Sequence, residues 1–184
     1  MRILFLDSFE TLVVDILAWV IFHLSIGYTT SKIHVDKFNP DRKWYQTKPW
    51  EKGGEVYQQI FRVKDWKKFI PSGAALYKGA YEIKNMVSYS VQNVRLWLKE
   101  SCRAEFCHWM MILPGFFFFL WNSTAGAWVN LAYAILNNLV PIVMQRYNRP
   151  RVRKLLLQLE RKSNTKEEPA INYAPQTSYS HSYR

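Results

Sequence analysis

The chain has 184 residues, 49% of them hydrophobic, and a formal net charge of +11 at pH 7. A chain of this length could bury the core of one soluble domain, so length and composition exclude neither a soluble nor a membrane protein. The apolar residues decide between these classes, because they concentrate in three stretches and most basic residues lie beside those stretches. This pattern indicates contact with anionic lipid headgroups and argues against a nucleic-acid partner.

Three stretches are close to the length that an apolar helix needs to cross about 30 Å of hydrocarbon. They are residues 12–28, 106–121 and 127–144. Tryptophans lie near the ends of the second and third stretches, as they do at the two faces of a membrane. We therefore expect an all-α integral membrane protein with about three transmembrane helices, in a single membrane domain over residues 1–162.

The first stretch is predicted to remain attached as an anchor. Residues 1–10 hold one Arg against the acidic Asp7 and Glu10, whereas a cleaved signal peptide, the alternative, begins with net positive charge. Lys and Arg residues number one before the first stretch, fifteen between the first and second, none in the following turn, and nine after the third stretch. By the positive-inside rule, the large loop and the C-terminus are cytoplasmic.

Amphipathic patterns flank the apolar stretches. Residues 55–70 and 150–162 place apolar side chains at helical spacing among basic ones, which is typical of helices in the headgroup plane, and Pro150 is expected to begin the second of them. A similar pattern from residue 86 predicts a helix that could run straight into the second stretch. Residues 163–184 have no apolar period and are predicted to form a disordered tail.

The motif RAEFCHW, residues 103–109, is the densest polar group within apolar sequence. Glu105 and His108 are three residues apart and would share a helix face, while Arg103 points elsewhere. A carboxylate that fixes the tautomer of a histidine is typical of a general base, and ionisable groups at membrane depth are functional by default. The alternative is a structural pair without a reaction to perform. One Glu-x-x-His supplies too few ligands for a di-iron site, so no metal is expected.

The motif QRYNRPR ends the third stretch on the same predicted membrane face. Arginine forks bind phosphate or carboxylate, and Asn148 could orient a sugar hydroxyl or a carbonyl. The alternative is that Arg146, Arg149 and Arg151 only anchor the helix end among anionic headgroups. The mixture of amides with arginines favours binding, because anchoring needs only charge.

Other polar residues give weaker signals. Asp15 and His23, within the first stretch, are eight residues apart and could share a face toward the interior of the bundle. Cys102 and Cys107 are five residues apart, which makes a disulfide or a metal site between them improbable. The sequence contains no G-x-S-x-G, G-x-x-x-x-G-K or H-E-x-x-H motif.

The segments FRVKDWKKFIP, RAEFCHWMMILP and NLVPIVMQRYNRPR resemble the glycosyl-4,4'-diaponeurosporenoate acyltransferase family. The resemblance covers roughly residues 51–159, is weak over the first apolar stretch and is absent from the tail. Members of this family are small bacterial membrane proteins that esterify a sugar hydroxyl of a glycosylated carotenoid with a fatty acid, in the synthesis of staphyloxanthin. The resemblance implies an acyltransferase of the bacterial cell membrane, with a glycosylated carotenoid as acceptor.

The resemblance also implies a site. His108, oriented by Glu105, would remove the proton from a primary sugar hydroxyl, and Arg146, Arg149 and Lys67 would bind the phosphates of the donor or neutralise the oxyanion. The expected catalytic residues are thus His108 and Glu105, and the expected substrate-binding residues are Arg103, Arg146, Asn148, Arg149, Lys67, Asp65 and Trp66. No bound cofactor is expected, and acyl-CoA is the expected co-substrate.

Two alternatives to this function stay open at the level of the sequence. An acyltransferase acting on another glycolipid shares every residue argument above. A non-enzymatic membrane scaffold would use its arginines to hold anionic lipids, and there an Arg149→Lys change would cost little. The acyl chain, the sugar and the oligomeric state are not encoded in any recognisable pattern.

Overall fold

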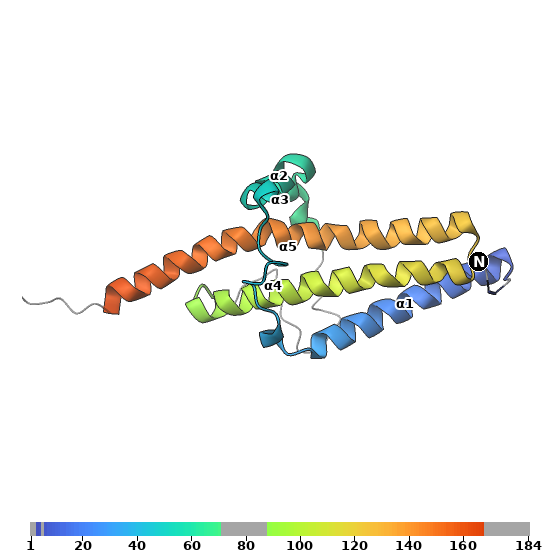
Figure 1. Cartoon of the computed structure of the whole chain (residues 1–184), viewed down its shortest axis with the longest axis horizontal. Coiled ribbons are helices and arrows are strands. Elements are labelled where there is room, and N and C mark those ends of the chain that lie inside the picture. The colour runs from blue at the N-terminus through green and yellow to red at the C-terminus, as the bar shows by residue number, and fades with distance from the viewer. Residues whose placement is uncertain (1–2, 5, 71–87, 168–184) are drawn as a thin grey trace, which may run out of the picture.

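The computed structural model describes residues 3–4, 6–70 and 88–167, and every regular element within them is helical. This confirms the predicted all-α class. Three long rods lie side by side along the molecule, formed by α1, by α4 continued by η5, and by α5 (Figure 1). The elements in chain order are α1 (Ser8–Lys32), η1 (Val35–Lys37), η2 (Pro49–Gly54), α2 (Glu55–Phe61), α3 (Val63–Trp66), η3 (Lys67–Phe69), α4 (Val91–Ile112), η5 (Leu113–Leu120) and α5 (Thr124–Glu167).

Helix α1 contains the first predicted stretch and extends beyond it at both ends. It begins with a capping box, in which the Glu10 N–H donates to Asp7 Oδ1 (2.8 Å) and the Asp7 N–H donates to Glu10 Oε2 (3.1 Å). The helix has 25 residues, which is enough to cross the hydrocarbon of a bilayer. One long side of it leaves large apolar side chains exposed, among them Leu12, Ile16, Leu17, Val20, Ile21 and Leu24.

The second predicted stretch is not one α-helix. Helix α4 does run from Val91 into this stretch, as the amphipathic pattern predicted, with Ser90 as its N-cap. From Leu113 the chain continues as the 3-10 helix η5, because Pro114 in its first turn lacks the N–H that would continue an α-helical ladder. Gly115 then lies against α5, where an added Cβ would be only 3.0 Å from Leu131 and Ala134 atoms. Only two of the described helices, α1 and α5, have the length and apolar content of membrane spans.

Helix α5 is a single element of 44 residues that contains the third predicted stretch. The expectation that a new helix begins at Pro150 is wrong, because α5 passes through both Pro141 and Pro150. Each proline removes one backbone hydrogen bond, but the buried side chains of Ile142 and Val143 keep this part of the helix packed against the rest of the structure. Helix α5 changes direction in its middle (Figure 1), as helices do at proline. It continues to Glu167, past the expected start of the tail, and residues 168–184 lie outside the described part.

Residues 49–69, called the lobe below, pack on the middle of α5. The expected single helix over residues 55–70 is instead divided into α2, α3 and η3, because Arg62 has a left-handed backbone (φ 49°). Tyr57 and Val63 of the lobe are buried against Val143 and Tyr147 of α5. Apolar burial of this kind contributes roughly 2 kcal/mol per side chain, so the lobe is firmly attached.

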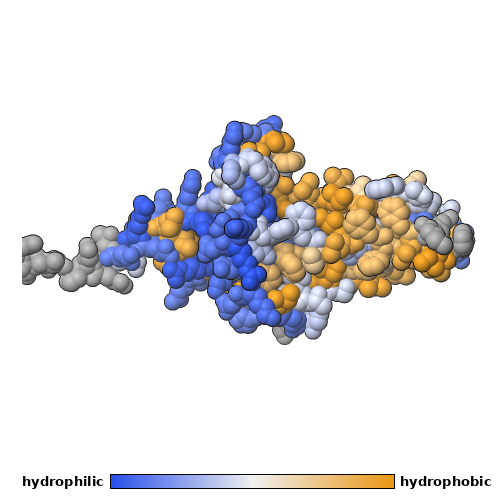
Figure 2. All heavy atoms as spheres, in the orientation of Figure 1, coloured by the Kyte–Doolittle hydropathy of each residue, from blue (hydrophilic) through white to orange (hydrophobic). Residues whose placement is uncertain are grey.

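Polar and apolar residues separate along the length of the molecule. On the face seen in Figure 2, one half is covered by apolar residues and the other half by hydrophilic ones. The apolar half holds α1, η5 and the first half of α5, whereas the hydrophilic half holds the start of α4 and the second half of α5 (Figures 1 and 2). The lobe lies over the boundary between the halves and exposes Trp50, Ile60, Phe61 and Phe69. A rod that is apolar at one end and charged at the other matches a membrane-embedded protein with a large polar end.

Candidate active site

The two polar motifs of the sequence meet between α4 and α5. Glu105 of α4 is completely buried, and its Oε1 accepts a hydrogen bond from Arg146 Nε at 2.8 Å. Its Oε2 lies 2.7 Å from Arg149 Nη2. This second contact is a charge pairing only, since Oε2 accepts no hydrogen bond from the described residues. The two motifs thus lie side by side on neighbouring helices, where they bind each other, and their placement at one face of a membrane stays a prediction.

Arg149 is enclosed by protein atoms. Its Nη1 donates to the Tyr45 carbonyl (3.1 Å), its Nη2 donates to the Ser101 carbonyl (3.1 Å), and its Nε donates to Ser101 Oγ (3.3 Å). Ser101 Oγ in turn donates to Gln145 Oε1 at 2.9 Å. These contacts use all three nitrogens of the guanidinium group, so it holds the 45–47 segment, α4 and α5 together.

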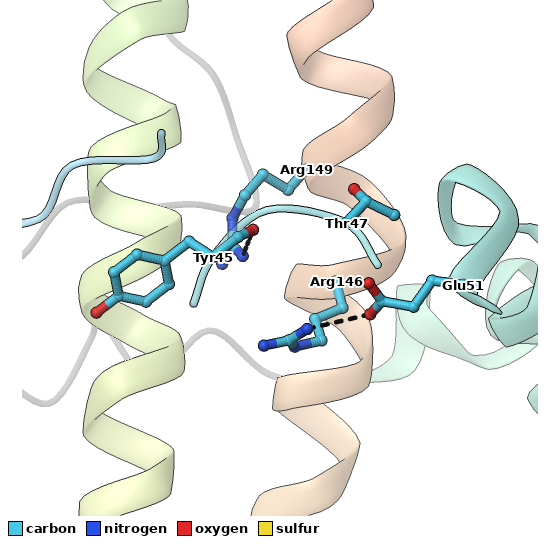
Figure 3. A pocket seen from close by; sticks show the side chains of 5 residues that line it. All are labelled: Tyr45, Thr47, Glu51, Arg146 and Arg149. Atoms are coloured by element: carbon cyan, nitrogen blue, oxygen red, sulfur yellow. Dashed lines mark hydrogen bonds and ion pairs between the residues drawn. The ribbon is translucent and has the colours of Figure 1, made fainter. Parts of the chain in front are cut away.

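Arg146 joins a second carboxylate to the first. Its Nη1 lies 3.1 Å from Oε1 of Glu51, which is 1% exposed, and its Nη2 donates to the Trp44 carbonyl at 3.0 Å. Glu51 also accepts hydrogen bonds from the Tyr57 hydroxyl and the Lys48 N–H. Figure 3 shows Glu51 and Arg146 directed toward each other across the gap between η2 and α5. Two carboxylates and two guanidinium groups thus form a buried network without net charge.

The protonation states in this network follow from the same contacts. Burial alone would raise the pKa of Glu51, but the hydrogen bonds from Tyr57, Lys48 and Arg146 outweigh it and lower this pKa below its ordinary value. Burial and the nearby Glu51 carboxylate raise the pKa of Tyr57. Burial also raises the pKa of Tyr45 to about 12. Near neutral pH, both tyrosines are therefore neutral and Glu51 is ionised.

The network leaves no room for a ligand. A small pocket lies among Tyr45, Thr47, Glu51, Arg146 and Arg149 (Figure 3), but it has no space for the centre of a water molecule. Arg146 and Arg149 were expected to present open forks to a phosphate, and the structure instead gives both guanidinium groups internal partners. The physical reason is that a buried arginine must be neutralised, and Glu105 and Glu51 do so.

His108 does not pair with Glu105. Its Nδ1 lies 2.9 Å from Oδ1 of Asn138, which is 1% exposed on α5. The expectation that Glu105 orients His108 is wrong because the two arginines take up the carboxylate. Spacing of three residues on a helix permitted the Glu105–His108 contact, but the charges on the facing helix attract Glu105 more strongly.

The lobe brings together two of the predicted substrate-binding residues. Lys67 Nζ donates to Asn148 Oδ1 at 3.3 Å and lies over the Tyr147 ring. Burial lowers the pKa of Lys67, and the neighbouring cations Arg151 and Lys64 lower it further. The Lys67 side chain has further N–H donors besides the one that Asn148 accepts.

Asp65, Trp66 and Arg103, also predicted to bind substrate, make local structural contacts. Asp65 forms an ion pair with Arg62 at 2.8 Å, and Trp66 Nε1 donates to the Phe61 carbonyl at 2.5 Å. Arg103 Nη1 donates to the Ser31 and Ile33 carbonyls at the end of α1, and Arg103 Nη2 lies 2.7 Å from Glu100. Asp65 and Trp66 thus stabilise the lobe, and Arg103 joins α4 to the end of α1.

A family model described as glycosyl-4,4'-diaponeurosporenoate acyltransferase matches residues 41–158. A protein of that name from Staphylococcus aureus strain N315 is 31% identical over 144 residues, which are 78% of this chain and 87% of the relative. The chain belongs to the glycosyl-4,4'-diaponeurosporenoate acyltransferase family.

Further relatives have the same name. The one from Staphylococcus aureus strain MRSA252 is 30% identical over 78% of this chain and 87% of its own length. The one from Staphylococcus haemolyticus strain JCSC1435 is 28% identical over 73% of this chain and 78% of its own length. No solved structure matches the chain.

The matched range of the acyltransferase family separates two groups of polar residues. It contains the arginine network, the His108–Asn138 pair and the Lys67–Asn148 pair, and it leaves out α1. In α1, Asp15 accepts hydrogen bonds from Trp121, Asn122 and Asn130. His23 Nδ1 lies 2.8 Å from the Trp19 carbonyl, so Asp15 and His23 have separate partners.

Three residues of the candidate site, Asn138, Glu51 and Tyr57, were not predicted from the sequence. Asn138 carried a usable signal, since a polar amide within an apolar stretch needs a partner. Glu51 and Tyr57 carried none, because their pairing depends on how the lobe folds onto α5. Among the described residues, no group of three or more His, Cys, Asp or Glu side chains could hold a metal ion, and both cysteines are free thiols.

Proposed function

We propose that the chain is a membrane acyltransferase that esterifies a sugar hydroxyl of a glycosylated diaponeurosporenoate with a fatty acyl group, a step in the synthesis of staphyloxanthin-type carotenoids. Membership of the acyltransferase family over residues 41–158 is the observation that carries this proposal. The chain covers most of the length of relatives named for this activity, which supports an activity of the whole protein.

In this proposal His108 is the general base. Among the described residues no hydrogen bond reaches its Nε2, because only Nδ1 is engaged by Asn138. Nε2 takes the proton of the sugar hydroxyl while the hydroxyl oxygen forms a bond to the acyl carbonyl carbon. The tetrahedral intermediate then expels the thiolate of the donor, which takes up the proton from the imidazolium. The products are an ester and a thiol, and His108 returns to its neutral form.

The membrane arrangement has three passes. They are formed by α1, by the end of α4 with η5, and by the first half of α5, with the lobe and the C-terminal half of α5 in the cytoplasm and its interface. The two helices with the length of spans and the apolar half seen in Figure 2 support this arrangement. The excess of Lys and Arg outside these passes supports the orientation. His108 then lies near the cytoplasmic edge of the second pass, where a water-soluble donor and a lipid acceptor can meet.

The donor in this proposal is acyl-CoA. A groove of about 470 Å³ lies in the hydrophilic half between α4, α5 and the segment at residues 39–41. Its apolar lining consists of Leu98, Leu156 and Leu157, and its rim carries Arg95, Lys99 and Arg153 beside Asp41 and Glu160. The rim cations have carboxylate partners, but exposed ion pairs contribute only about 0–1 kcal/mol, so a phosphate can replace a partner at low cost.

The distance from this groove to His108 fits a donor with a long flexible arm. Leu98 of the groove and His108 lie on the same helix, ten residues and therefore roughly 15 Å apart along its axis. A donor whose phosphates lie at the rim can extend its pantetheine arm along α4, which carries the thioester to the histidine.

The polar pair at the lobe binds a substrate group other than the reacting hydroxyl in this proposal, because Asn148 is ten residues, roughly 15 Å along α5, from the Asn138 that contacts His108. Lys67 and Asn148 form the polar pair between the lobe and α5, and both can bind hydroxyl groups. The arginine network, with Arg103, Asp65 and Trp66, holds the elements that carry the site. The polyene and the acyl chain lie along the exposed aromatic and aliphatic side chains of the apolar half.

Mass spectrometry of lipid extracts tests the function. A host that makes glycosylated diaponeurosporenoate is compared with and without the chain, and with its His108→Ala and His34→Ala variants. We expect a fatty-acyl mass increment with the wild type and with His34→Ala, whose side chain is exposed, and a loss of about 10²- to 10⁴-fold with His108→Ala. No increment despite protein in the membrane would favour the scaffold alternative. An increment on a different glycolipid would change the acceptor.

A further inference from the structure

The amide of Asn138 has a fixed orientation. Its Nδ2 donates to the Ala134 carbonyl, one turn earlier on α5, at 2.9 Å. A carbonyl only accepts, so the nitrogen of the amide must face Ala134 and the oxygen must face His108. Asn138 is 1% exposed, and its side chain therefore cannot exchange these partners for water.

This orientation determines which nitrogen of His108 carries the proton. The Asn138 oxygen accepts and does not donate, so the neutral imidazole must donate from Nδ1 across the 2.9 Å contact. The lone pair is then on Nε2, where a base needs it. Without Asn138, nothing among the described residues would hold the proton on Nδ1, and an imidazole free in solution prefers to carry its proton on Nε2.

We propose that Asn138 is the positioning residue of the reaction, which holds His108 in the tautomer whose Nε2 accepts the proton of the sugar hydroxyl. This inference rests on the proposed role of His108 as base. The sequence predicted that the Glu105 carboxylate would orient His108. In the structure, a neutral amide from a different helix takes this position.

A neutral amide is suited to this place for an electrostatic reason. A carboxylate beside Nδ1 would stabilise the imidazolium ion, so a larger fraction of His108 would be protonated and unable to act as base. Among the described residues, His23 faces His108 from α1, Glu105 lies one turn away on its own helix and is neutralised by arginines, and α5 contributes the Asn138 amide. Asn138 thus fixes the ring without adding charge.

The tautomer can be measured without any activity. Nitrogen-15 NMR of the detergent-solubilised protein with labelled histidine distinguishes a protonated Nδ1 from a protonated Nε2, and the His108→Gln variant identifies the signals of His108. We expect a neutral His108 protonated on Nδ1 in the wild type, and a shift toward protonated Nε2 in Asn138→Ala. A wild-type His108 protonated on Nε2 would overturn the inference, whatever the enzyme does.

The pH profile of acyl transfer supplies the second test. Asn138→Ala should lower kcat by about 10- to 100-fold, and Asn138→Asp should move the acidic limb of the profile to higher pH by about one unit, because a carboxylate stabilises the imidazolium. Asn137→Ala, the neighbouring exposed amide, should change neither. Immunoblots of membranes and melting temperatures establish that each variant is folded.

The outcomes separate this inference from the proposed function. If His108→Ala is inactive but Asn138→Asp is folded with an unchanged acidic limb, His108 remains the base and the positioning role of Asn138 is wrong. If His108→Ala retains full activity, the proposed base is wrong, and the NMR result alone then decides whether Asn138 sets the tautomer.

Discussion

Glu105 of α4 forms a buried ion pair with Arg149 of α5, with 2.7 Å between Oε2 and Nη2 and with side-chain exposures of 0% and 4%. Burying a carboxylate and a guanidinium group costs several kcal/mol unless each finds partners, and both find them here through Arg146, Ser101 and Tyr45. The pair therefore specifies how α4 and α5 meet, just below the histidine that we propose as base. Its removal should affect the fold before it affects the chemistry.

Arg149→Lys should destabilise the protein by about 3 kcal/mol, because lysine leaves the buried Glu105 and two backbone carbonyls without adequate partners. The measurement is the unfolding midpoint in detergent, followed by kcat of the fraction that remains folded. Arg95→Lys is the matched control, since Arg95 is 61% exposed in its pair with Glu160 and should lose less than about 1 kcal/mol. Equal effects of both substitutions would show that Arg149 is not a structural centre.

Gly54→Ala should loosen the lobe, whereas Gly53→Ala should have a smaller effect. Both glycines have positive φ, 65° at Gly53 and 90° at Gly54, so each substitution strains the backbone by about 1 kcal/mol. Only at Gly54 would the new Cβ also meet α5, at 3.1 Å from the Tyr147 carbonyl. We expect faster proteolysis within the lobe for Gly54→Ala only. Similar cleavage rates for both variants would contradict the close packing of η2 on α5.

Glu51→Gln should remove part of the acid sensitivity of the protein. The folded state lowers the pKa of Glu51 below its ordinary 4.5, so this carboxylate stabilises the fold above pH 4.5, and the stabilisation disappears as the pH falls through the lowered pKa. The wild type should thus be more stable than the variant at pH 7, and the difference should shrink on acidification below pH 4.5. Melting temperatures across this range provide the measurement. Glu55→Gln, at a 59% exposed carboxylate, is the control and should show little pH-dependent difference.

Arg153→Glu should weaken binding of the donor without changing the acceptor. Arg153 lies on the rim of the groove, and reversing its charge should raise KM for acyl-CoA by about tenfold, with kcat at saturation and KM for the glycoside preserved. Lys154→Glu changes the net charge equally at an exposed position outside the groove and should leave KM nearly unchanged. If both variants raise KM equally, the effect is long-range attraction and the groove is not the donor site.

The sequence was sufficient to predict the structural class, an all-α protein with apolar helices. Three apolar stretches with basic flanks predict helices in a membrane, and this pattern survives any detail of packing because it depends on composition and on a period of 3.6 residues. Likewise, the segments around RAEFCHW and QRYNRPR were sufficient to recognise the acyltransferase family, which the match over residues 41–158 then showed. The sequence placed both motifs at one membrane face, and the structure brings Glu105 of the first motif against Arg146 and Arg149 of the second.

Only the tertiary structure decided which partner each polar side chain takes. Glu105 could reach His108 on its own helix, but Arg146 and Arg149 on α5 offer two full charges, and in a buried place charge pairing prevails over a neutral hydrogen bond. His108 then takes Asn138, thirty residues along the chain, whose amide no local pattern connects to it. Pro150 similarly looks like the start of a helix, yet packing keeps α5 continuous through it. Local rules determine which segments are helical, whereas the extent of each helix and the choice among competing partners are decided where the helices meet.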